Sequence, residues 1–196
     1  HPMTIEDLWA MPRGGTPVPS PDGQAMIVPV TTYSMEANKG TTRLYWVPTH
    51  TRARTRGAAD PIRALTSAEV SSNQPAWSPD GERLVFIRKP GGEASERGPK
   101  YPNEGQLYLM SVDGGEPERL TDLPRGLTDP RWFPDGRRVA FLSEVFRGAR
   151  TLEQTARRVK ELAENPVKAA VTENRVYRFW DHWLTEDRVH HLFVLD

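Results

Sequence analysis

Charged and aromatic side chains gather in one short stretch near the C-terminal end of the sequence. Within residues 171–183 stand Glu173, Arg175 and Arg178, together with two tryptophans and one phenylalanine. A carboxylate can pair with a free amine, and a guanidinium can bind a carboxylate through two parallel hydrogen bonds. These three residues are therefore candidate substrate-binding residues. The alternative is structural, because aromatic side chains bury large areas and commonly belong to a core or to a seam between domains.

The other residues that could do chemistry are histidines and serines. The spacing of His182, His190 and His191 matches no zinc signature. Neighbours along a strand point to opposite faces, so His190 and His191 cannot easily share one metal ion. Ser78 and Ser143 occupy positions that turns and strands explain, which argues against a nucleophile paired with these histidines. We therefore expect no catalytic residue, no metal and no cofactor in this chain.

The composition argues against several classes of function. Lysine plus arginine and aspartate plus glutamate each number 26, so the formal net charge is zero and no overall field attracts nucleic acid or an anionic membrane. Cysteine is absent, which excludes disulfides, thiolate catalysis and iron–sulfur clusters. The apolar runs are far shorter than the roughly 18 residues that cross a bilayer. We interpret the run of Arg52, Arg54 and Arg56 as a solvated loop rather than a nucleic-acid contact.

The first residues bear on location. The stretch from His1 to Thr4 has neither the basic start nor the apolar segment of a signal peptide. Met3 as the natural first residue would favour a cytoplasmic protein. A signal peptide that has been cleaved off is the alternative.

A repeated turn motif organises the chain. Ser-Pro-Asp-Gly at 20–23, Ser-Pro-Asp-Gly at 78–81 and Phe-Pro-Asp-Gly at 133–136 start 58 and 55 residues apart, and an apolar segment follows each copy. Proline presets φ near about −65° at the first central turn position, and glycine takes the positive φ that closes a tight hairpin. The flanking segments are therefore predicted to pair as antiparallel strands.

Each repeat continues in the same order. A strand such as 84–87, apolar on both faces, precedes a second hairpin strand, as at 43–47 and 106–112, and a closing Leu-Thr at 65–66 and 120–121. Four short antiparallel strands in each roughly 40- to 55-residue repeat are typical of a β-propeller blade. The sequence thus predicts an all-β protein with about three four-stranded blades of a larger ring. A generic β-sandwich with three unrelated turns is the alternative.

The third repeat contains an insertion that predicts a helix. Thr151 and Gln154 form a capping-box pattern, in which the threonine oxygen accepts from the backbone three residues on and Gln154 reaches back to the cap. Asn165-Pro166 ends the helix, which is expected at about 152–164. Its charged face is either a solvated surface or a docking face for another domain. Its apolar face consists of Leu152, Ala156, Val159, Leu162 and Ala163.

The domain organisation follows from these elements. Residues 1–196 are predicted to form part of an N-terminal β-propeller domain, without a catalytic domain. A short N-terminal helix is expected at 4–11, and blades are expected to start near 17, 74 and 129. The helical insertion is expected at 149–166.

Several stretches resemble one protein family. The string from Pro75 to Thr121, with Ala-Trp-Ser-Pro-Asp-Gly and Asp-Gly-Gly-Glu-Pro, resembles the propeller repeat that TolB-type proteins share with relatives of prolyl oligopeptidase. The opening from Thr4 to Arg13 is similar to the start of bacterial acylaminoacyl peptidases and dipeptidyl peptidases. The segment 175–183, followed by 188–194, resembles that family's Trp-Asp strand, which turns and returns as a His-Leu-Phe-Val strand.

The resemblance implies a substrate-gating propeller portion of a serine peptidase that hydrolyses short peptides, of acylaminoacyl- or dipeptidyl-peptidase type. The family's Ser-Asp-His triad belongs to an α/β-hydrolase domain with a Gly-x-Ser-x-Gly elbow, and this sequence has no such elbow. The chain alone is therefore expected to be an inactive part of a longer protein. Expected partners are a peptide substrate, the remaining blades and hydrolase domain of the same protein, and further copies in a homo-oligomer, with no nucleic acid and no membrane. A non-catalytic TolB-type propeller that binds proteins is the alternative.

Overall fold

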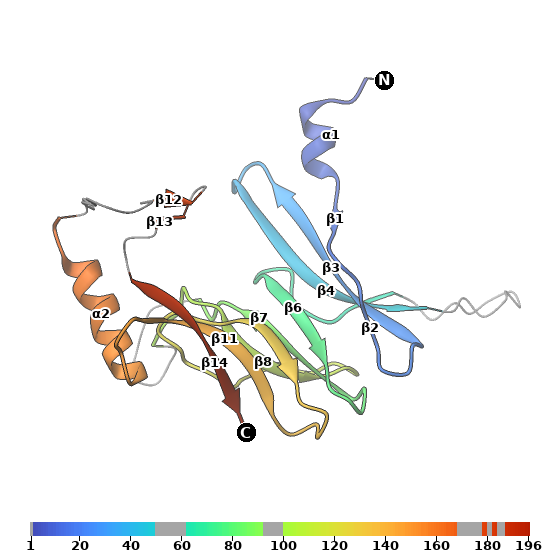
Figure 1. Cartoon of the computed structure of the whole chain (residues 1–196). Helices are drawn as coiled ribbons and strands as arrows, with labels where there is room; N and C mark the ends of the chain where they lie inside the picture. The colour runs from blue at the N-terminus through green and yellow to red at the C-terminus, as the bar shows by residue number, and fades with distance from the viewer. Residues whose placement is uncertain (1, 50–61, 92–99, 168–177, 180–181, 184–186) are drawn as a thin grey trace, which may run out of the picture.

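The computed structural model describes residues 2–49, 62–91, 100–167, 178–179, 182–183 and 187–196, and it is mostly β-structure with two helices (Figure 1). Three antiparallel sheets of three or more strands follow one another along the chain. The first contains β1 (Arg13–Gly14), β2 (Val18–Pro19), β3 (Ala25–Ser34), β4 (Lys39–Pro48) and β5 (Arg63–Ala64). The second contains β6 (Ser72–Trp77), β7 (Arg83–Arg88), β8 (Gln106–Ser111) and β9 (Glu118–Arg119). The third contains β10 (Thr128–Trp132), β11 (Val139–Phe146) and β14 (Arg188–Leu195).

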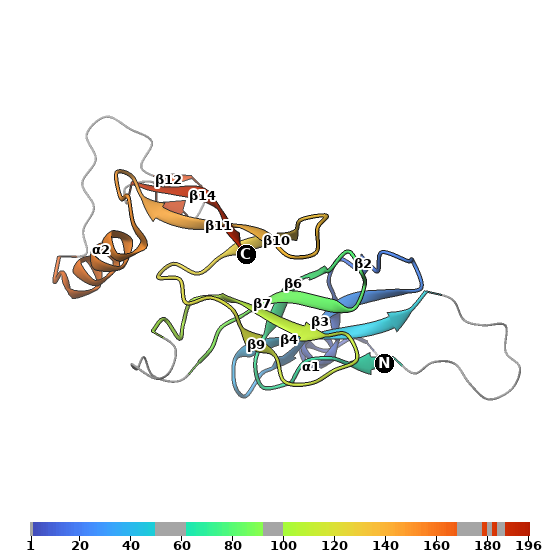
Figure 2. The same ribbon diagram turned by 90° about the horizontal axis from the view of Figure 1, so that it is seen from below.

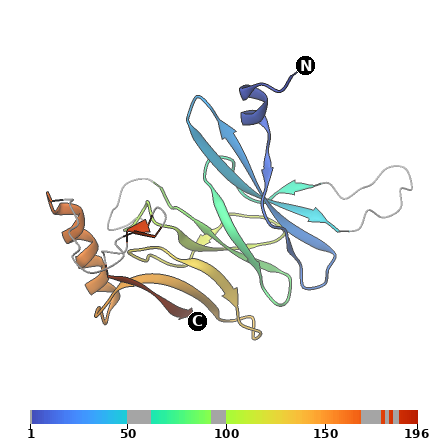
Figure 3. The ribbon, with the colours of Figure 1, turned by 45° about the horizontal axis from the view of Figure 1, so that its top comes forward.

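The remaining elements are short or lie at the periphery. Strands β12 (Arg178–Phe179) and β13 (His182–Trp183) pair with each other. Helix α1 (Ile5–Ala10) precedes the first sheet and lies beside the far end of the β3–β4 hairpin, and α2 (Leu152–Glu164) follows β11 (Figure 3). Among the described residues, no helix combines the length and apolar character needed to cross a membrane.

The sheets pack face to face in chain order, with the second between the first and the third (Figure 2). The reason is the sequence of β7, whose consecutive residues Leu84, Val85, Phe86 and Ile87 are all buried. Alternate side chains of a strand point to opposite faces, so β7 contributes to two cores at once. Leu84 and Phe86 pack with Ile27 and Leu44 of the first sheet, and Val85 and Ile87 pack with Val139 and Phe141 of the third. The prediction of a strand that is apolar on both faces is confirmed.

The repeated turns form as their residues predict. Gly23, Gly81 and Gly136 have φ of 71°, 76° and 66°, and the backbone N–H of Gly81 donates to the carbonyl of Ser78. The serine of the motif adds a bond that proline and glycine do not explain. The backbone N–H of Arg83 donates to Ser78 Oγ at 2.9 Å, and this hydroxyl in turn donates to Asp80. The motif therefore closes the hairpin through side chains as well as through backbone conformation.

The closing Leu-Thr of the first two repeats likewise adds hydrogen bonds to the neighbouring strand. The backbone N–H groups of Leu65 and Leu120 donate to the carbonyls of Leu44 and Leu107, each at 2.8 Å. In the return direction, Leu44 N–H donates to Thr66 Oγ1 at 3.0 Å, and Leu107 N–H donates to the corresponding hydroxyl of the second repeat at 2.9 Å. The threonine that follows β5 or β9 thus adds one side-chain hydrogen bond to the pairing of that strand with β4 or β8.

Both predicted helices are confirmed, with one correction at a cap. In α2, Thr151 Oγ1 accepts from the backbone N–H of Gln154 at 3.3 Å, and Asn165 is the C-terminal cap. Gln154 does not close a capping box on Thr151. Its Oε1 accepts instead from the backbone N–H of Arg150 at 2.6 Å, because the long side chain reaches one residue beyond the cap. In α1 both bonds of a capping box are present, between Thr4 and Asp7.

Two other features differ from the sequence analysis, namely the number of strands in the first sheet and the partner of β14. Apart from the β12–β13 hairpin, the described residues form three sheets without a closed ring, so the number of blades stays a prediction. The first sheet has five strands, because the short strands β1 and β2 both pair with β3. The strand β14 was expected to be the return of the Trp-Asp segment, and it pairs with β11. Eight residue pairs, from Val139–Leu195 to Phe146–Arg188, join β14 to β11, while β12 and β13 form their own hairpin.

Candidate functional site

A cavity of about 460 Å³ opens where the first strands of the three sheets approach one another. Strand β6 contacts both β2 and β10. The lining comes from equivalent places in the three repeats. Thr16, Gln74 and Asp129 each stand immediately before a proline, four residues ahead of the repeated turn, and all three line the cavity. The repeat therefore builds this cavity from one position used three times.

The backbone at two of these positions is unusual. Gln74 and Asp129 have φ of 50° and 51°, in the left-handed region that non-glycine residues seldom adopt. A following proline disfavours the right-handed helical region, and both strands are bulged at this point. The left-handed conformation costs roughly 1–2 kcal/mol per residue. Residues held in this way are enriched at functional sites.

The side chains of one glutamine and two tryptophans hold the strands of neighbouring repeats at fixed positions. The backbone N–H of Asp129 donates to Gln74 Oε1 at 2.7 Å, across 55 residues of sequence. Trp77 Nε1 donates to the carbonyl of Val18 at 2.9 Å, and Trp132 Nε1 donates to that of Ala76 at 3.2 Å. Val18 and Ala76 are equivalent positions, so the same bond joins the first repeat to the second and the second to the third.

The cavity has an apolar floor and a polar rim. Pro75 and Pro130 are buried, whereas Gln74, Asp129 and Arg131 are exposed. Such a combination is typical of ligand sites, in which apolar surface provides contact and a few polar groups fix orientation. The cavity is the candidate functional site of the described chain.

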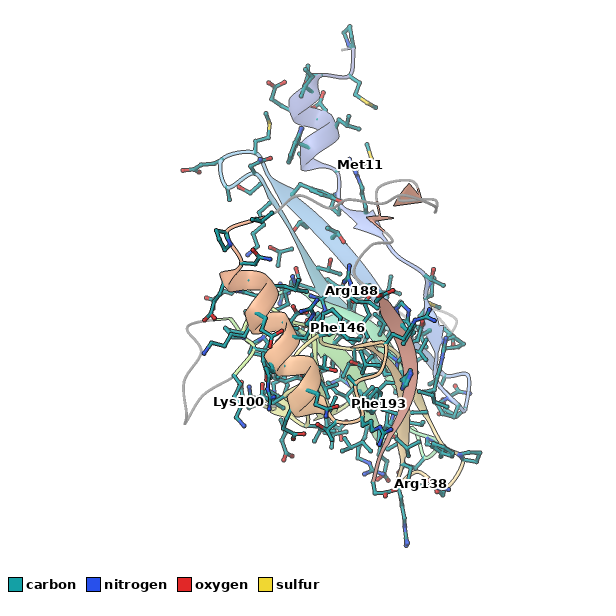
Figure 4. The ribbon with its side chains drawn as sticks, turned by 60° about the vertical axis from the view of Figure 1, so that its left-hand side comes forward. Met11, Lys100, Arg138, Phe146, Arg188 and Phe193 are labelled. Atoms are coloured by element: carbon teal, nitrogen blue, oxygen red, sulfur yellow. The ribbon has the colours of Figure 1, made fainter. Side chains whose placement is uncertain are left out.

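A second group of charges lies in the third sheet, away from this lining. Glu144 Oε2 accepts from Arg125 Nη2 at 2.8 Å and from Arg188 Nη1 at 2.7 Å. Figure 4 shows Arg188 beside Phe146 at one end of the sheet, with Arg138 at the opposite end. Burial of Glu144 would by itself raise the pKa of its carboxyl group, but the hydrogen bond from Arg125 and the two positive charges outweigh burial and hold that pKa below 4.5. This cluster ties the loop before β10 to β11 and β14.

The lowered pKa of Glu144 predicts a pH-dependent contribution to stability. A carboxyl group with a lower pKa in the folded state stabilises the fold above its unfolded pKa, and the contribution is lost as the pH falls through the folded pKa. At neutral pH, Glu144→Gln is therefore expected to be less stable than the wild type, and the difference should shrink as the pH falls below 4.5. Urea unfolding at a series of pH values measures this difference.

Glu36→Gln is the matched control, because Glu36 is exposed at the tip of the β3–β4 hairpin. It should change stability little at any pH. A constant difference between the wild type and Glu144→Gln across the acidic range would contradict the predicted role of the Glu144 charge.

Comparison with known proteins gives this fold a family. No protein-family model matches the chain. A curated relative, the uncharacterized peptidase YuxL of Bacillus subtilis, is 33% identical over 137 residues, which are 70% of this chain and 18% of the relative. The dipeptidyl-peptidase 5 of Porphyromonas endodontalis is 25% identical over 194 residues, which are 98% of this chain and 24% of that protein. The chain is homologous to the propeller portion of prolyl oligopeptidase-family peptidases.

A solved structure agrees with this assignment at the level of the fold. The acylaminoacyl peptidase of Pyrococcus horikoshii has a TM-score of 0.64 over 96% of this chain and 24% of its own chain, at 12% identity. Residues 1–196, the propeller portion, therefore span about a quarter or less of the length of such proteins.

The described structure does not test the sequence-predicted site residues of this propeller portion. Glu173 and Arg175 lie outside the described residues. Arg178 begins β12, and its side chain is outside what the structure describes. In β14, His190 and His191 face Glu144 and Ser143 in the register, on opposite faces of the sheet. Within the described part of the chain, no group of three or more histidine, aspartate or glutamate side chains is arranged to hold a metal ion.

Sequence reasoning missed the cavity residues of the propeller portion. Gln74 and Asp129 entered the sequence analysis only as the expected starts of the second and third blades. The available signal was the X-Pro dipeptide at the same place in all three repeats, at Thr16, Gln74 and Asp129. Equivalent positions of a radial repeat meet near one axis, so a polar residue repeated there predicts a lined opening.

Proposed function

We propose that this chain is the substrate-gating portion of a longer serine peptidase that hydrolyses short peptides, of acylaminoacyl- or dipeptidyl-peptidase type. The observation that carries the proposal is the match to dipeptidyl-peptidase 5, which includes 98% of this chain. Acyl transfer of this kind needs a serine nucleophile, a histidine base and an aspartate that orients the histidine. In our proposal these three residues stand in an α/β-hydrolase domain outside residues 1–196.

The proposed role of the chain itself is selection by size. Sites for small ligands typically measure roughly 300–1,000 Å³. A cavity of about 460 Å³ therefore suits a short peptide segment and is far too small for a folded domain. The shared cores and the tryptophan hydrogen bonds hold its walls in place. Sheets that cover the reacting centre would also keep bulk water from it.

The proposal includes further sheets that continue the ring beyond the third. On the outer face of the third sheet, Leu192 and Val194 are 69% and 48% exposed and pair in register with Leu142 and Ala140. A neighbouring sheet would cover this apolar face, as the second sheet covers the first. Without it, the chain alone should self-associate through this face and its strand edge.

Glu173, Arg175 and Arg178 stay proposed anchors for a substrate terminus in the longer protein. Exopeptidases must hold one end of the substrate, and a carboxylate or a guanidinium supplies the required charge. Replacing each with glutamine in the full-length protein should raise KM more than it lowers kcat if that residue binds a terminus. The cytoplasm is the proposed location, which fractionation of producing cells tests.

A serine-directed fluorophosphonate probe tests the proposed function. The full-length protein is expected to react with the probe and to release chromophore from acylated amino acids or from dipeptides with a free N-terminus. Residues 1–196 alone are expected to do neither. Absence of both labelling and hydrolysis in the full-length protein would reject the peptidase, and a reading frame that holds only further propeller repeats would favour the TolB-type scaffold.

A further inference from the structure

The charges at the rim of the cavity come from one repeat. In β10, Asp129 and Arg131 are two residues apart, and both line the cavity. The positions equivalent to Asp129 carry Thr16 and Gln74, which are uncharged. The position equivalent to Arg131 is Val18 in the first repeat and a buried alanine in the second. The third repeat therefore adds one negative and one positive group to a site that the repeat otherwise leaves neutral.

Neither charge is used to hold the fold together. Elsewhere in the chain, Arg138 pairs with Asp135 at 2.8 Å and Arg83 pairs with Asp80 at 3.4 Å. Within the described residues, the side chains of Asp129 and Arg131 form no ion pair with each other or with another group. Unpaired charges of opposite sign that share a cavity are available for a ligand that carries both signs.

The backbone of Asp129 is held in place, although its carboxylate forms no ion pair within the described residues. Its backbone has φ of 51°, and its N–H donates to Gln74 Oε1 at 2.7 Å. This bond joins the second and third sheets at the rim. A carboxylate on a backbone that is held in this way loses little freedom when a cation binds to it, which favours binding.

The floor between the two charges suits the chain of a peptide. Pro75 and Pro130 are buried there, and Val18 is partly buried. Proline has no backbone N–H, so the floor offers apolar contact with few competing donors.

We propose that Asp129 and Arg131 select short peptides by their charged ends, Asp129 accepting hydrogen bonds from an ammonium group and Arg131 donating to a carboxylate. The inference rests on the proposed function and adds to it a substrate class, namely short peptides with free termini. The ammonium has two possible sources in a peptide, the N-terminus and a lysine side chain, and the experiment separates them.

The test measures binding of four versions of one alanine-rich tetrapeptide to the full-length protein by isothermal titration calorimetry, after treatment with the fluorophosphonate probe so that hydrolysis does not interfere. The four versions have free ends, an acetylated N-terminus, an amidated C-terminus, and both blocks. Exposed ion pairs contribute up to about 1 kcal/mol, which corresponds to about a fivefold change in Kd. Each block is therefore expected to weaken binding to the wild type by about three- to fivefold.

The variants assign each end to one residue. Asp129→Asn should remove the effect of acetylation and keep the effect of amidation, and Arg131→Gln should do the reverse. Asparagine retains a carbonyl acceptor, so a purely structural role of Asp129 would leave the acetylation effect unchanged. Glu36→Gln and Arg137→Gln, at exposed positions outside the cavity lining, are the matched charge controls and should retain both effects. An acetylated peptide with one lysine that regains affinity for the wild type, but not for Asp129→Asn, would assign the ammonium to a side chain.

Two results would overturn the inference. One is that no version of the peptide binds the wild type saturably, and the other is that Asp129→Asn keeps the acetylation effect. Hydrolysis by the full-length protein keeps this failure separate from that of the proposed function. If Asp129→Asn hydrolyses peptides with unchanged preference for free termini, only the proposed selection by Asp129 is rejected, and the peptidase proposal stands. Asp129-dependent peptide binding by a full-length protein that hydrolyses nothing would reject the peptidase alone.

Discussion

Phe86→Ala is expected to lower the free energy of unfolding by about 3–5 kcal/mol, the range for removing a buried phenylalanine. Phe86 is fully buried between the first and second sheets, and its ring stacks on Tyr108 with centroids 6.0 Å apart. Its removal leaves a cavity bordered by two sheets, and neither sheet can move in to fill the cavity without losing its strand pairing. Urea unfolding followed by tryptophan fluorescence measures the change.

The matched control for this prediction is Met35→Ala. Met35 is a large apolar residue with 50% exposure, close to the tip of the β3–β4 hairpin. Its replacement should change the free energy of unfolding by less than about 0.5 kcal/mol, as is usual for surface positions. Equal effects of the two substitutions would contradict the arrangement in which β7 separates two cores.

Gly126→Ala is expected to lower the free energy of unfolding by about 2–4 kcal/mol, combining a left-handed backbone penalty with overpacking. Gly126 has φ of 61°, and a Cβ atom there would lie 2.7 Å from the carbonyl oxygen of Gly105. The obstacle is backbone, so rotation of a side chain cannot relieve it. The carbonyl of Gly126 itself accepts from Ser143 Oγ at 2.6 Å, which fixes the loop to β11.

Gly23→Ala separates the two contributions. Gly23 has φ of 71°, and no atom lies within 4 Å of an added Cβ. Only the conformational penalty of about 1–2 kcal/mol should remain there. If both alanine variants lose the same stability, the close approach of Gly126 to Gly105 is absent in solution.

The parts of the fold that follow from neighbouring residues could be predicted from the sequence. Turn closure depends on the local Ser-Pro-Asp-Gly, and the start and end of α2 depend on Thr151 and Asn165. These signals act over a few residues, so periodicity and turn chemistry reveal them. The burial of β7 on both faces was also predictable, because four consecutive apolar residues require cover on each side.

The parts that depend on distant residues could not be predicted in the same way. Glu144 pairs with Arg125 and Arg188, which lie 19 and 44 residues away in the sequence, and no local pattern connects these residues. The partner of β14 depends on which strand edge is free after the helical insertion. The cavity arises only when equivalent strands of three repeats meet, so Asp129 and Arg131 gained their significance from the structure.

The measurement that most directly tests the central claim uses the full-length protein and two substrates that contain the same short cleavable sequence. The rate constant kcat/KM is measured for the free peptide and for the same sequence inside a rigid folded domain. A substrate-gating role predicts hydrolysis of the free peptide, with cleavage of the folded form too slow to detect. Equal cleavage of both forms, or cleavage of neither, would contradict the account.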